Sequence, residues 1–313
     1  MSRSAAIQSG VPRVFDRDQV RKNRIRCRRV FHDHDFICDL AGREIADRLL
    51  DIRKEFATGI MNGAGRLSPD TLASIARNGG VKTLFATDIL AGQEHDIVLA
   101  EEELPFGKDS LDFIGSFLTL HTANDLPGAL IQINYALRPD GLFLGAMFGG
   151  ETLYELRQAM IHTETRLKGG VTPRVMPFAD KQQMGALLQR AGFALPVVDS
   201  DIIEVTYNNL HDLLYDVRGM GESNVVSDRS LACPGKTFFQ EVEKTYREHF
   251  RDPGDNLTAR FEIIYLIGWA PHNSQQQPLR PGSAESSLAT ALGTQEQDTG
   301  IPVDGNWKKG ESE

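Results

Sequence analysis

Cysteine and long apolar runs are both scarce in this sequence of 313 residues. Its three cysteines, Cys27, Cys38 and Cys233, form no Cys-x-x-Cys pair. That number argues against a disulfide framework or a cysteine zinc site and favours a reducing compartment. No apolar stretch approaches the roughly 20 residues that a membrane-spanning helix needs. The N-terminus also lacks the apolar core of a secretory signal, so we expect none.

Acidic residues outnumber basic ones: the sequence has 34 Lys and Arg against 43 Asp and Glu, which gives a net charge of −9. This balance argues against a general nucleic-acid binder, because phosphate contacts need a basic surface. The exception is a dense basic run at 21–29, which is either a solvated helix face or a docking patch for an acidic partner. The following His32-Asp33-His34-Asp35 could seed an iron site or form a solvated loop. Spacing identifies no third ligand, so we predict no metal.

Apolar runs alternate with helical patterns through the middle of the chain. Ala41, Ile45 and Leu49 recur at helical spacing, and a glycine-containing turn is expected at 59–65. Further helices are expected at 68–79 and 124–137, the first with Ser68 as N-cap and Pro69 at its first position. Strands are expected at 81–86, 97–100, 111–117, 142–148 and 261–269, with a turn at 138–141. This alternation predicts an α/β, doubly wound, Rossmann-like parallel sheet covered on both faces.

The ends of these strands carry residues suited to a nucleoside. Gly63-Ala64-Gly65 would let the backbone approach a ligand, and Asp88 follows Gly65 at close to the roughly 20-residue interval of ribose-binding acids. Glu101, Glu102 and Glu103 close the next strand, where a carboxylate can accept from an adenine amino group. A carboxylate-rich rim suits the sulfonium of S-adenosylmethionine better than a pyrophosphate. The alternative is that the glycines form only a tight turn and Asp88 only a cap. The candidate cofactor-binding residues are Asn62, Gly63, Ala64, Gly65, Asp88, Ile89, Glu101, Glu102 and Phe117.

Several long segments resemble the class I S-adenosylmethionine-dependent methyltransferase superfamily. They include ELPFGKDSLDFIGSFLTLHTANDLPGAL (103–130), LRPDGLFLGAMFGGETLYELR (137–157) and RGMGESN (218–224). One branch is matched closely, that of the mitochondrial and alphaproteobacterial complex I assembly factors described as arginine hydroxylases. LPFGKDSLDF and TLHTANDLPGAL would also suit the malonyl-carrier-protein methyltransferases of biotin synthesis. The resemblance spans roughly 14–269 and implies the class I methyltransferase fold and S-adenosylmethionine as cofactor.

The first glycine loop departs from the family pattern, which is an acidic residue followed by Leu-Gly-Cys-Gly-Arg-Gly. Here Met61 stands at the acidic position, which normally helps place the methionine end of the cofactor, and Leu67 replaces the last glycine. The departure implies weakened cofactor binding, or a cofactor that is held without being used for methyl transfer. Asn62 could supply a polar contact but no charge.

Two side chains are candidates for catalysis. His121 follows the 111–117 strand, and its ordinary pKa permits acid–base work, although it could instead satisfy backbone groups. Tyr154 follows Gly149-Gly150 and could close over the ligand, while Leu153, Leu156 and Met160 have the spacing of core residues. The glycine-rich stretch 219–224 fits either a substrate-facing loop or a surface turn.

We expect a basic extension at 1–39, a methyltransferase-like domain at 40–270 and a disordered tail at 271–313, because the tail is too polar to offset its ordering entropy. The resemblance implies hydroxylation of an arginine on a complex I iron–sulfur subunit, in the bacterial cytoplasm or the mitochondrial matrix. The protein substrate could be reached during transient association with a membrane complex. A methyltransferase acting on a small-molecule or carrier-protein carboxyl group, and a non-catalytic assembly chaperone, remain as alternatives.

Overall fold

The computed structural model describes residues 12–92, 96–276 and 292–294. Contacts divide the chain into two units, and the first, Met1–Asn273, contains the sheet and its helices. The predicted disordered tail lies mostly outside the described residues. Within the described residues, no helix is both long and apolar enough to cross a bilayer.

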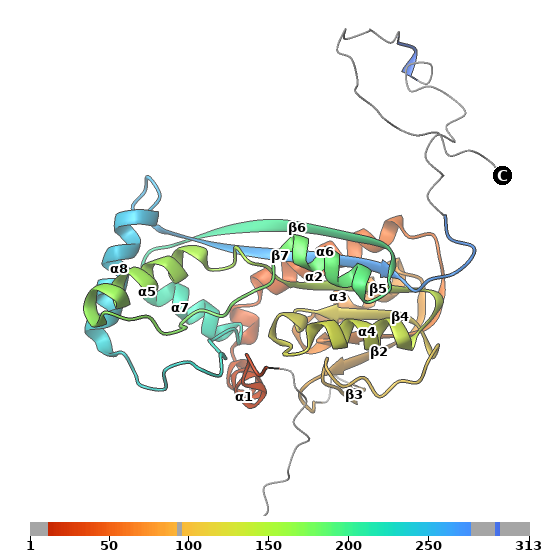
Figure 1. The fold of residues 1–313 in the computed structure, drawn as a ribbon, viewed down its shortest axis with the longest axis horizontal. Coiled ribbons are helices and arrows are strands. Elements are labelled where there is room, and N and C mark those ends of the chain that lie inside the picture. The colour runs from red at the N-terminus through yellow and green to blue at the C-terminus, as the bar shows by residue number, and fades with distance from the viewer. Residues whose placement is uncertain (1–11, 93–95, 277–291, 295–313) are drawn as a thin grey trace, which may run out of the picture. The chain divides into compact units, whose positions relative to one another are not determined.

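A seven-stranded sheet forms the centre of the first unit, in the order β3-β2-β1-β4-β5-β7-β6 (Figure 1). Pairing is parallel from β3 to β5, and β7 runs antiparallel to both of its neighbours. The predicted α/β Rossmann-like fold is confirmed, but the sheet is mixed rather than wholly parallel. The strands are β1 (Phe56–Asn62), β2 (Val81–Asp88), β3 (Ile97–Val98), β4 (Leu111–Phe117), β5 (Leu137–Phe148), β6 (Ala194–Tyr207) and β7 (Leu257–Trp269).

Helices cover both faces of this sheet. α2 and α3 contribute to the apolar core on one face, and α4 and α6 to the core on the other. β6 and β7 extend beyond β5, and α5 and α8 pack together against this extension (Figure 1). The α-helices are α1 (Arg17–Cys27), α2 (Phe36–Arg48), α3 (Pro69–Asn78), α4 (Leu126–Ala136), α5 (Tyr154–Lys168), α6 (Lys181–Arg190), α7 (Leu210–Gly219) and α8 (Gly235–Phe250).

Neighbouring residues of the central strands point into opposite cores. Phe113 and Leu142 are buried in the core beneath α2, and Ile114 and Phe143 are buried in the core beneath α4. Strands buried on both faces read as continuous apolar runs. This explains why periodicity located β4 correctly at Leu111–Phe117.

The segment expected to be a turn at 59–65 is in its first half the central strand β1. Gly59 pairs with Phe113 of β4, and a Cβ at Gly59 would lie 2.8 Å from the Phe113 carbonyl oxygen. Glycine is therefore required here by close packing between strands, and not by a turn. The turn prediction was wrong for 59–62 and holds only from Gly63 onward.

The turn expected at 138–141 is instead a bulge within β5. The pairing of β4 with β5 shifts register between Leu111 and Phe113, and Asp140 has a φ of 64°. Extra residues on one strand are accommodated in this way without ending the ladder. The local turn chemistry was recognised correctly, but the strand continues through it from Leu137.

The basic segment is part of the first unit. The predicted boundary between residues 39 and 40 falls inside α2. α1 carries the basic run up to Arg26, and Arg28 and Arg29 follow the end of the helix at Cys27. All basic residues of the run are exposed except Arg24, which is 8% exposed. A solvated helix face accounts for most of the run but not for Arg24.

Replacing Ser68 with alanine should lower the free energy of unfolding by about 1 kcal/mol. Its hydroxyl oxygen accepts the Thr71 N–H at 3.1 Å and caps α3, so alanine leaves this donor without a partner. Urea unfolding measures the loss. Ser74→Ala, in the interior of the same helix, is the control and should be neutral or slightly stabilising, because alanine is the better helix former.

A candidate active site at the carboxyl ends of the strands

The turn after β1 requires glycine at its first position. Gly63 has a φ of 80°, and a Cβ built there would lie 2.1 Å from the Phe117 carbonyl oxygen at the end of β4. Its N–H donates to the Thr87 carbonyl of β2 at 2.9 Å. The turn is thus held tightly between the ends of β2 and β4, where ligands bind in open α/β sheets.

Asp88 closes β2 beside this turn and is 4% exposed. Its carboxylate accepts the Gly65 N–H at 3.2 Å and the Leu90 N–H at 3.1 Å. A cavity of about 270 Å³ lies against this carboxylate, with Gly65 and Arg24 also in its wall. Because each carboxylate oxygen has two acceptor sites, Asp88 can still receive a hydrogen bond from a ligand hydroxyl.

Four ionisable side chains form a buried cluster next to this cavity. Arg24 and Arg66 donate to the same acceptor, the Leu118 carbonyl oxygen, at 3.0 and 3.2 Å. Arg66 also pairs with Glu222 at 2.5 Å, and the second oxygen of Glu222 lies 3.0 Å from His121 Nε2. We call these four residues (Arg24, Arg66, His121 and Glu222) the buried charge cluster.

The pKa values of the cluster follow from burial and from the two guanidinium groups. Burial by itself would raise the pKa of Glu222, but the charges of Arg66 and of the neighbouring cations outweigh it and hold that pKa well below its ordinary value. Burial lowers the pKa of His121, and its contact with Glu222 offsets this only in part. At neutral pH the cluster therefore holds two guanidinium cations, one carboxylate and a neutral imidazole. Its net charge is positive.

Stability should fall as the pH is lowered from 7 to 5, and His121 should contribute to this fall. A histidine whose pKa is lowered on folding takes up its proton more readily when unfolded, so stability present above the unfolded pKa of about 6.5 is lost below it. His121→Gln should flatten the slope, which for one group is at most about 1.4 kcal/mol per pH unit. Urea unfolding of both proteins across this range tests it; equal slopes would contradict the prediction. The depressed pKa of Glu222 acts in the same direction below about pH 4.3.

Two polar atoms of the cluster are buried without a hydrogen-bond partner among the described residues. They are Nε of Arg66 and Nδ1 of His121. The His121 ring packs edge-on against Phe148 at the end of β5, with 5.0 Å between ring centroids. Buried polar groups are normally paired, so these two atoms can still bond to a ligand or to water.

The predicted adenine-binding acids have partners within the protein. Glu101 is 3% exposed and pairs with Arg17 of α1 at 2.6 Å. Glu102 accepts the N–H groups of Asn124 and Asp125 ahead of α4, at 2.5 and 2.8 Å. Neither residue lines the cavity beside Asp88. Their role in adenine binding stays a prediction.

The other predicted cofactor-binding residues lie at the same edge of the sheet. Asn62 Oδ1 accepts from the Thr87 hydroxyl at 3.3 Å, and the Ile89 carbonyl accepts from the Arg21 guanidinium at 3.1 Å. Ala64 and Phe117 are buried in the core beneath α2. Of the predicted cofactor-binding residues, Gly65 and Asp88 line the cavity. The others named here lie next to them at the same edge of the sheet.

At the two positions that depart from the family glycine pattern, 61 and 67, the side chains pack against other parts of the protein. Met61 is fully buried, and a Cβ at Gly115 of β4 would lie 2.3 Å from its terminal carbon. A Cβ at Gly42 of α2 would lie 2.8 Å from Leu67 Cδ2. Both apolar side chains fill space left by a facing glycine. Leu67 also lines the cavity beside Asp88.

The remaining candidates lie apart from the cluster. Tyr154 packs against Phe250 of α8 with 6.2 Å between ring centroids, and it is 36% exposed. His34 Nδ1 lies 2.6 Å from Asp216, whereas the more exposed His32 contacts Asp35 at 3.2 Å. Among the described residues, no group of three or more acidic, histidine or cysteine side chains is placed to hold a metal. Catalysis by Tyr154 stays a prediction.

Arg24 and Glu222 were not identified as site residues from the sequence. Val20, Arg24 and Cys27 share one buried face of α1, and that helical spacing was the available signal. Glu222 lies in the glycine-rich stretch 219–224, where neither a substrate-facing loop nor a surface turn was favoured. Its partners Arg66 and His121 are more than 100 residues away in sequence, so no local pattern could identify it.

The strand order with β7 as the antiparallel strand, the glycine turn after β1 and the acid ending β2 define a class I methyltransferase-like protein. A family model described as a methyltransferase domain matches residues 69–145. The chain is 40% identical to the human mitochondrial arginine-hydroxylase NDUFAF5, over 88% of this chain and 82% of that protein. Identity to its zebrafish (Danio rerio) counterpart is 37%, covering 88% of both chains. The malonyl-[acyl-carrier protein] O-methyltransferase of Xylella fastidiosa is 35% identical over 54% of this chain and 55% of that protein.

The chain belongs to the family of the arginine-hydroxylase NDUFAF5. The matched 88% of the sequence necessarily includes the 219–224 stretch and therefore Glu222. The family relationship thus extends beyond the methyltransferase domain to the segment that contributes Glu222.

Proposed function

We propose that this chain binds S-adenosylmethionine at the carboxyl ends of β1, β2 and β4. With a two-electron oxidant supplied from outside, of the class of dioxygen plus a reductant, it hydroxylates an arginine on an iron–sulfur subunit during assembly of respiratory complex I. The observation that carries the chemistry is the family relationship over 88% of the chain to proteins named arginine-hydroxylase. The relatives named as malonyl O-methyltransferases match a smaller share of the chain, which favours the first activity.

The residues around the cavity fit the cofactor. Asp88 and the Gly65 backbone would hold the ribose, as acidic residues do after the second strand of such sheets. The surplus positive charge of Arg24 and Arg66 suits the carboxylate of the cofactor's amino-acid end, because guanidinium groups bind carboxylates through charged hydrogen bonds. Arg66 Nε, which has no hydrogen-bond partner in the part of the chain that the structure describes, would supply a donor. When bound, S-adenosylmethionine supplies a transferable methyl group.

We propose His121, the buried imidazole of the cluster, as the residue that transfers a proton. Its ring is held by Glu222 through Nε2, and Nδ1 has no hydrogen-bond partner among the described residues. A neutral imidazole with one free nitrogen can accept a proton. Glu222 would position that ring, and Arg66 would keep Glu222 ionised.

Mass spectrometry of the complex I iron–sulfur subunits from cells with and without this chain tests the proposal. Hydroxylation adds about 16 Da to an arginine-containing peptide, whereas methylation adds about 14 Da. We expect the heavier increment only in cells that contain the chain. An unchanged peptide mass would overturn the enzymatic proposal, and the smaller increment would support methyl transfer instead.

The reducing compartment implied by this function is the bacterial cytoplasm or the mitochondrial matrix. The human and zebrafish arginine-hydroxylases are named as mitochondrial. Cys27, Cys38 and Cys233 are all free, and the first two are buried. Free thiols agree with either location, because both compartments keep cysteine reduced. The proposed partner is the protein substrate, met while the subunit associates transiently with the membrane complex.

A further inference from the structure

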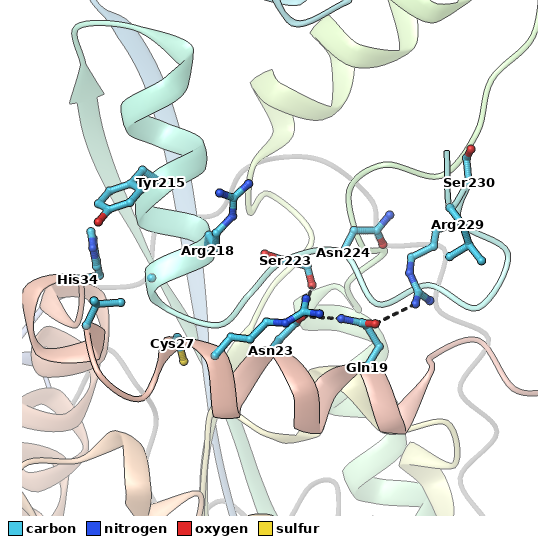
Figure 2. Close-up of a pocket in the computed structure, with 14 residues that line it drawn as sticks. Gln19, Asn23, Cys27, His34, Tyr215, Arg218, Ser223, Asn224, Arg229 and Ser230 are labelled. Atoms are coloured by element: carbon cyan, nitrogen blue, oxygen red, sulfur yellow. Dashed lines mark hydrogen bonds between the residues drawn. The ribbon is translucent and has the colours of Figure 1, made fainter. Parts of the chain in front are cut away.

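A second cavity, of about 440 Å³, lies between α1, α7 and the segment that follows α7 (Figure 2). It is separate from the cavity beside Asp88, although Cys27 contributes to the walls of both. Three arginines, Arg26, Arg218 and Arg229, line it, and no aspartate or glutamate does. The cavity thus gathers positive charge on the surface of a protein whose net charge is −9.

One side of this cavity is built by a chain of hydrogen bonds (Figure 2). Arg229 Nη2 donates to Gln19 at 3.2 Å, Gln19 donates to Asn23 at 2.7 Å, and Asn23 donates to the Ser223 carbonyl at 2.9 Å. These bonds join α1 to the segment 223–229, so this wall is formed before any ligand binds. Preformed walls lower the cost of ordering a site on binding.

The charges of the cavity are only partly neutralised by the protein. Arg229 pairs with Asp16 at 3.0 Å, and the nearby His34 pairs with Asp216. Arg26 and Arg218 are exposed, and neither makes a side-chain hydrogen bond or ion pair with any residue that the structure describes. Two guanidinium groups are therefore available to a carboxylate from outside, which is the partner that their planar donor geometry fits.

Arg218 connects this cavity to two neighbours whose walls carry apolar side chains and one carboxylate each, Glu243 and Glu222. Both carboxylates are paired with arginines of the chain, Arg247 and Arg66. Arg218 also lines a cavity of about 340 Å³ that contains Leu214 and Phe239, and another of about 320 Å³. Leu231, at the rim of the arginine-lined cavity, is 86% exposed. A single extended segment could therefore place acidic side chains on Arg26 and Arg218 and apolar side chains against Leu214 and Phe239. A small free anion would contact only the arginines of this surface and not its apolar side chains.

We propose that the arginine-lined cavity and the groove around Arg218 dock an acidic, amphipathic segment of a partner protein. This binding function is distinct from the cofactor cavity and does not depend on the chemistry performed there. Charge complementarity supplies the orientation and the rate of encounter, and the apolar neighbours add contact area. Within the basic run at 21–29, Arg26 is the basic residue that lines this cavity, and it is the part of the run that we assign to docking.

Fluorescence anisotropy of the full chain with a labelled oligopeptide that alternates glutamate with leucine tests this proposal. We expect saturable, salt-sensitive binding that the glutamine–leucine counterpart lacks. Arg26→Glu and Arg218→Glu should each weaken binding by roughly tenfold or more, because the reversed charge repels the peptide. Both side chains are exposed, so the variants should fold, and circular dichroism checks this.

Arg190→Glu is the matched control, since Arg190 is an exposed arginine in the last turn of α6 and lines none of these cavities. It should bind the acidic peptide as the unaltered chain does. Equal binding by all three variants, or equal binding of the glutamine counterpart, would overturn the proposal. Inorganic phosphate could also be tested as a competitor. If it displaced the peptide at concentrations equal to those of the peptide, and if this displacement required Arg218, the cavity would be a small-anion site and the proposal would be overturned.

Discussion

Replacing Glu222 with glutamine should lower the free energy of unfolding by about 3–5 kcal/mol, because the substitution leaves buried charges without a counter-ion. Glu222 is the carboxylate of the buried charge cluster and contacts both Arg66 and His121. Glutamine keeps the shape and one acceptor but not the charge. Burying an unpaired guanidinium costs far more than an exposed ion pair contributes. Urea unfolding at pH 7 measures the loss.

Two further variants separate this effect from a general loss of packing. Glu243→Gln removes a carboxylate from the partly exposed i,i+4 pair with Arg247 and should cost less than about 1 kcal/mol. Adding Arg66→Met to Glu222→Gln should restore part of the stability, because the second change removes one of the uncompensated charges. A double variant no more stable than Glu222→Gln would show that the electrostatic explanation is wrong.

Asp88→Ala should weaken S-adenosylmethionine binding by roughly 100-fold, a change of nearly 3 kcal/mol. The carboxylate lies in the wall of the cavity and also orients the Gly65 and Leu90 amides. Alanine therefore removes a charged acceptor and loosens the glycine turn at the same time. Isothermal titration calorimetry with the unaltered chain and the variant measures the difference.

Asp180→Ala provides the control for this experiment. Asp180 accepts a backbone amide at the start of α6, as Asp88 does after β2, but it does not line the cavity. The control should lose about 1 kcal/mol of stability and keep its affinity for the cofactor. Equal affinities of the Asp88 variant and the unaltered chain would place the cofactor elsewhere. Absence of binding by the unaltered chain would remove the cofactor from the proposed function while leaving the acidic-segment docking site untouched.

Much of the fold could be predicted because the strands buried on both faces leave apolar runs in the sequence. β4 was predicted at its observed bounds, and α3 was located by its Ser68 cap and its first-position proline. β1 was not recognised as a strand because Gly59, which close contact with Phe113 requires, looks like a turn residue in isolation. β6 was not predicted, since many of its residues are exposed or half-buried.

Some residues of the candidate site could be predicted from the sequence, and others could not. Gly65 and Asp88 could be predicted from their spacing, because adjacent parallel strands bring the two strand ends together. Glu101 was placed beside the cofactor by the same reasoning, but its carboxylate pairs with Arg17 of a helix far away in sequence. Strand order indicates which ends are neighbours. It does not indicate which side chains are already bound by another part of the chain.

The sequence by itself determined the alternation of strands and helices, the glycine turn and the acid that follows it, because each depends on residues close together along the chain. Only the tertiary structure decided the partners of the charged residues. It buried Arg24 while leaving Arg26 exposed, and it brought Glu222 between Arg66 and His121. The cost of burying a charge depends on what surrounds it in space, and those surroundings come from segments that no local pattern relates.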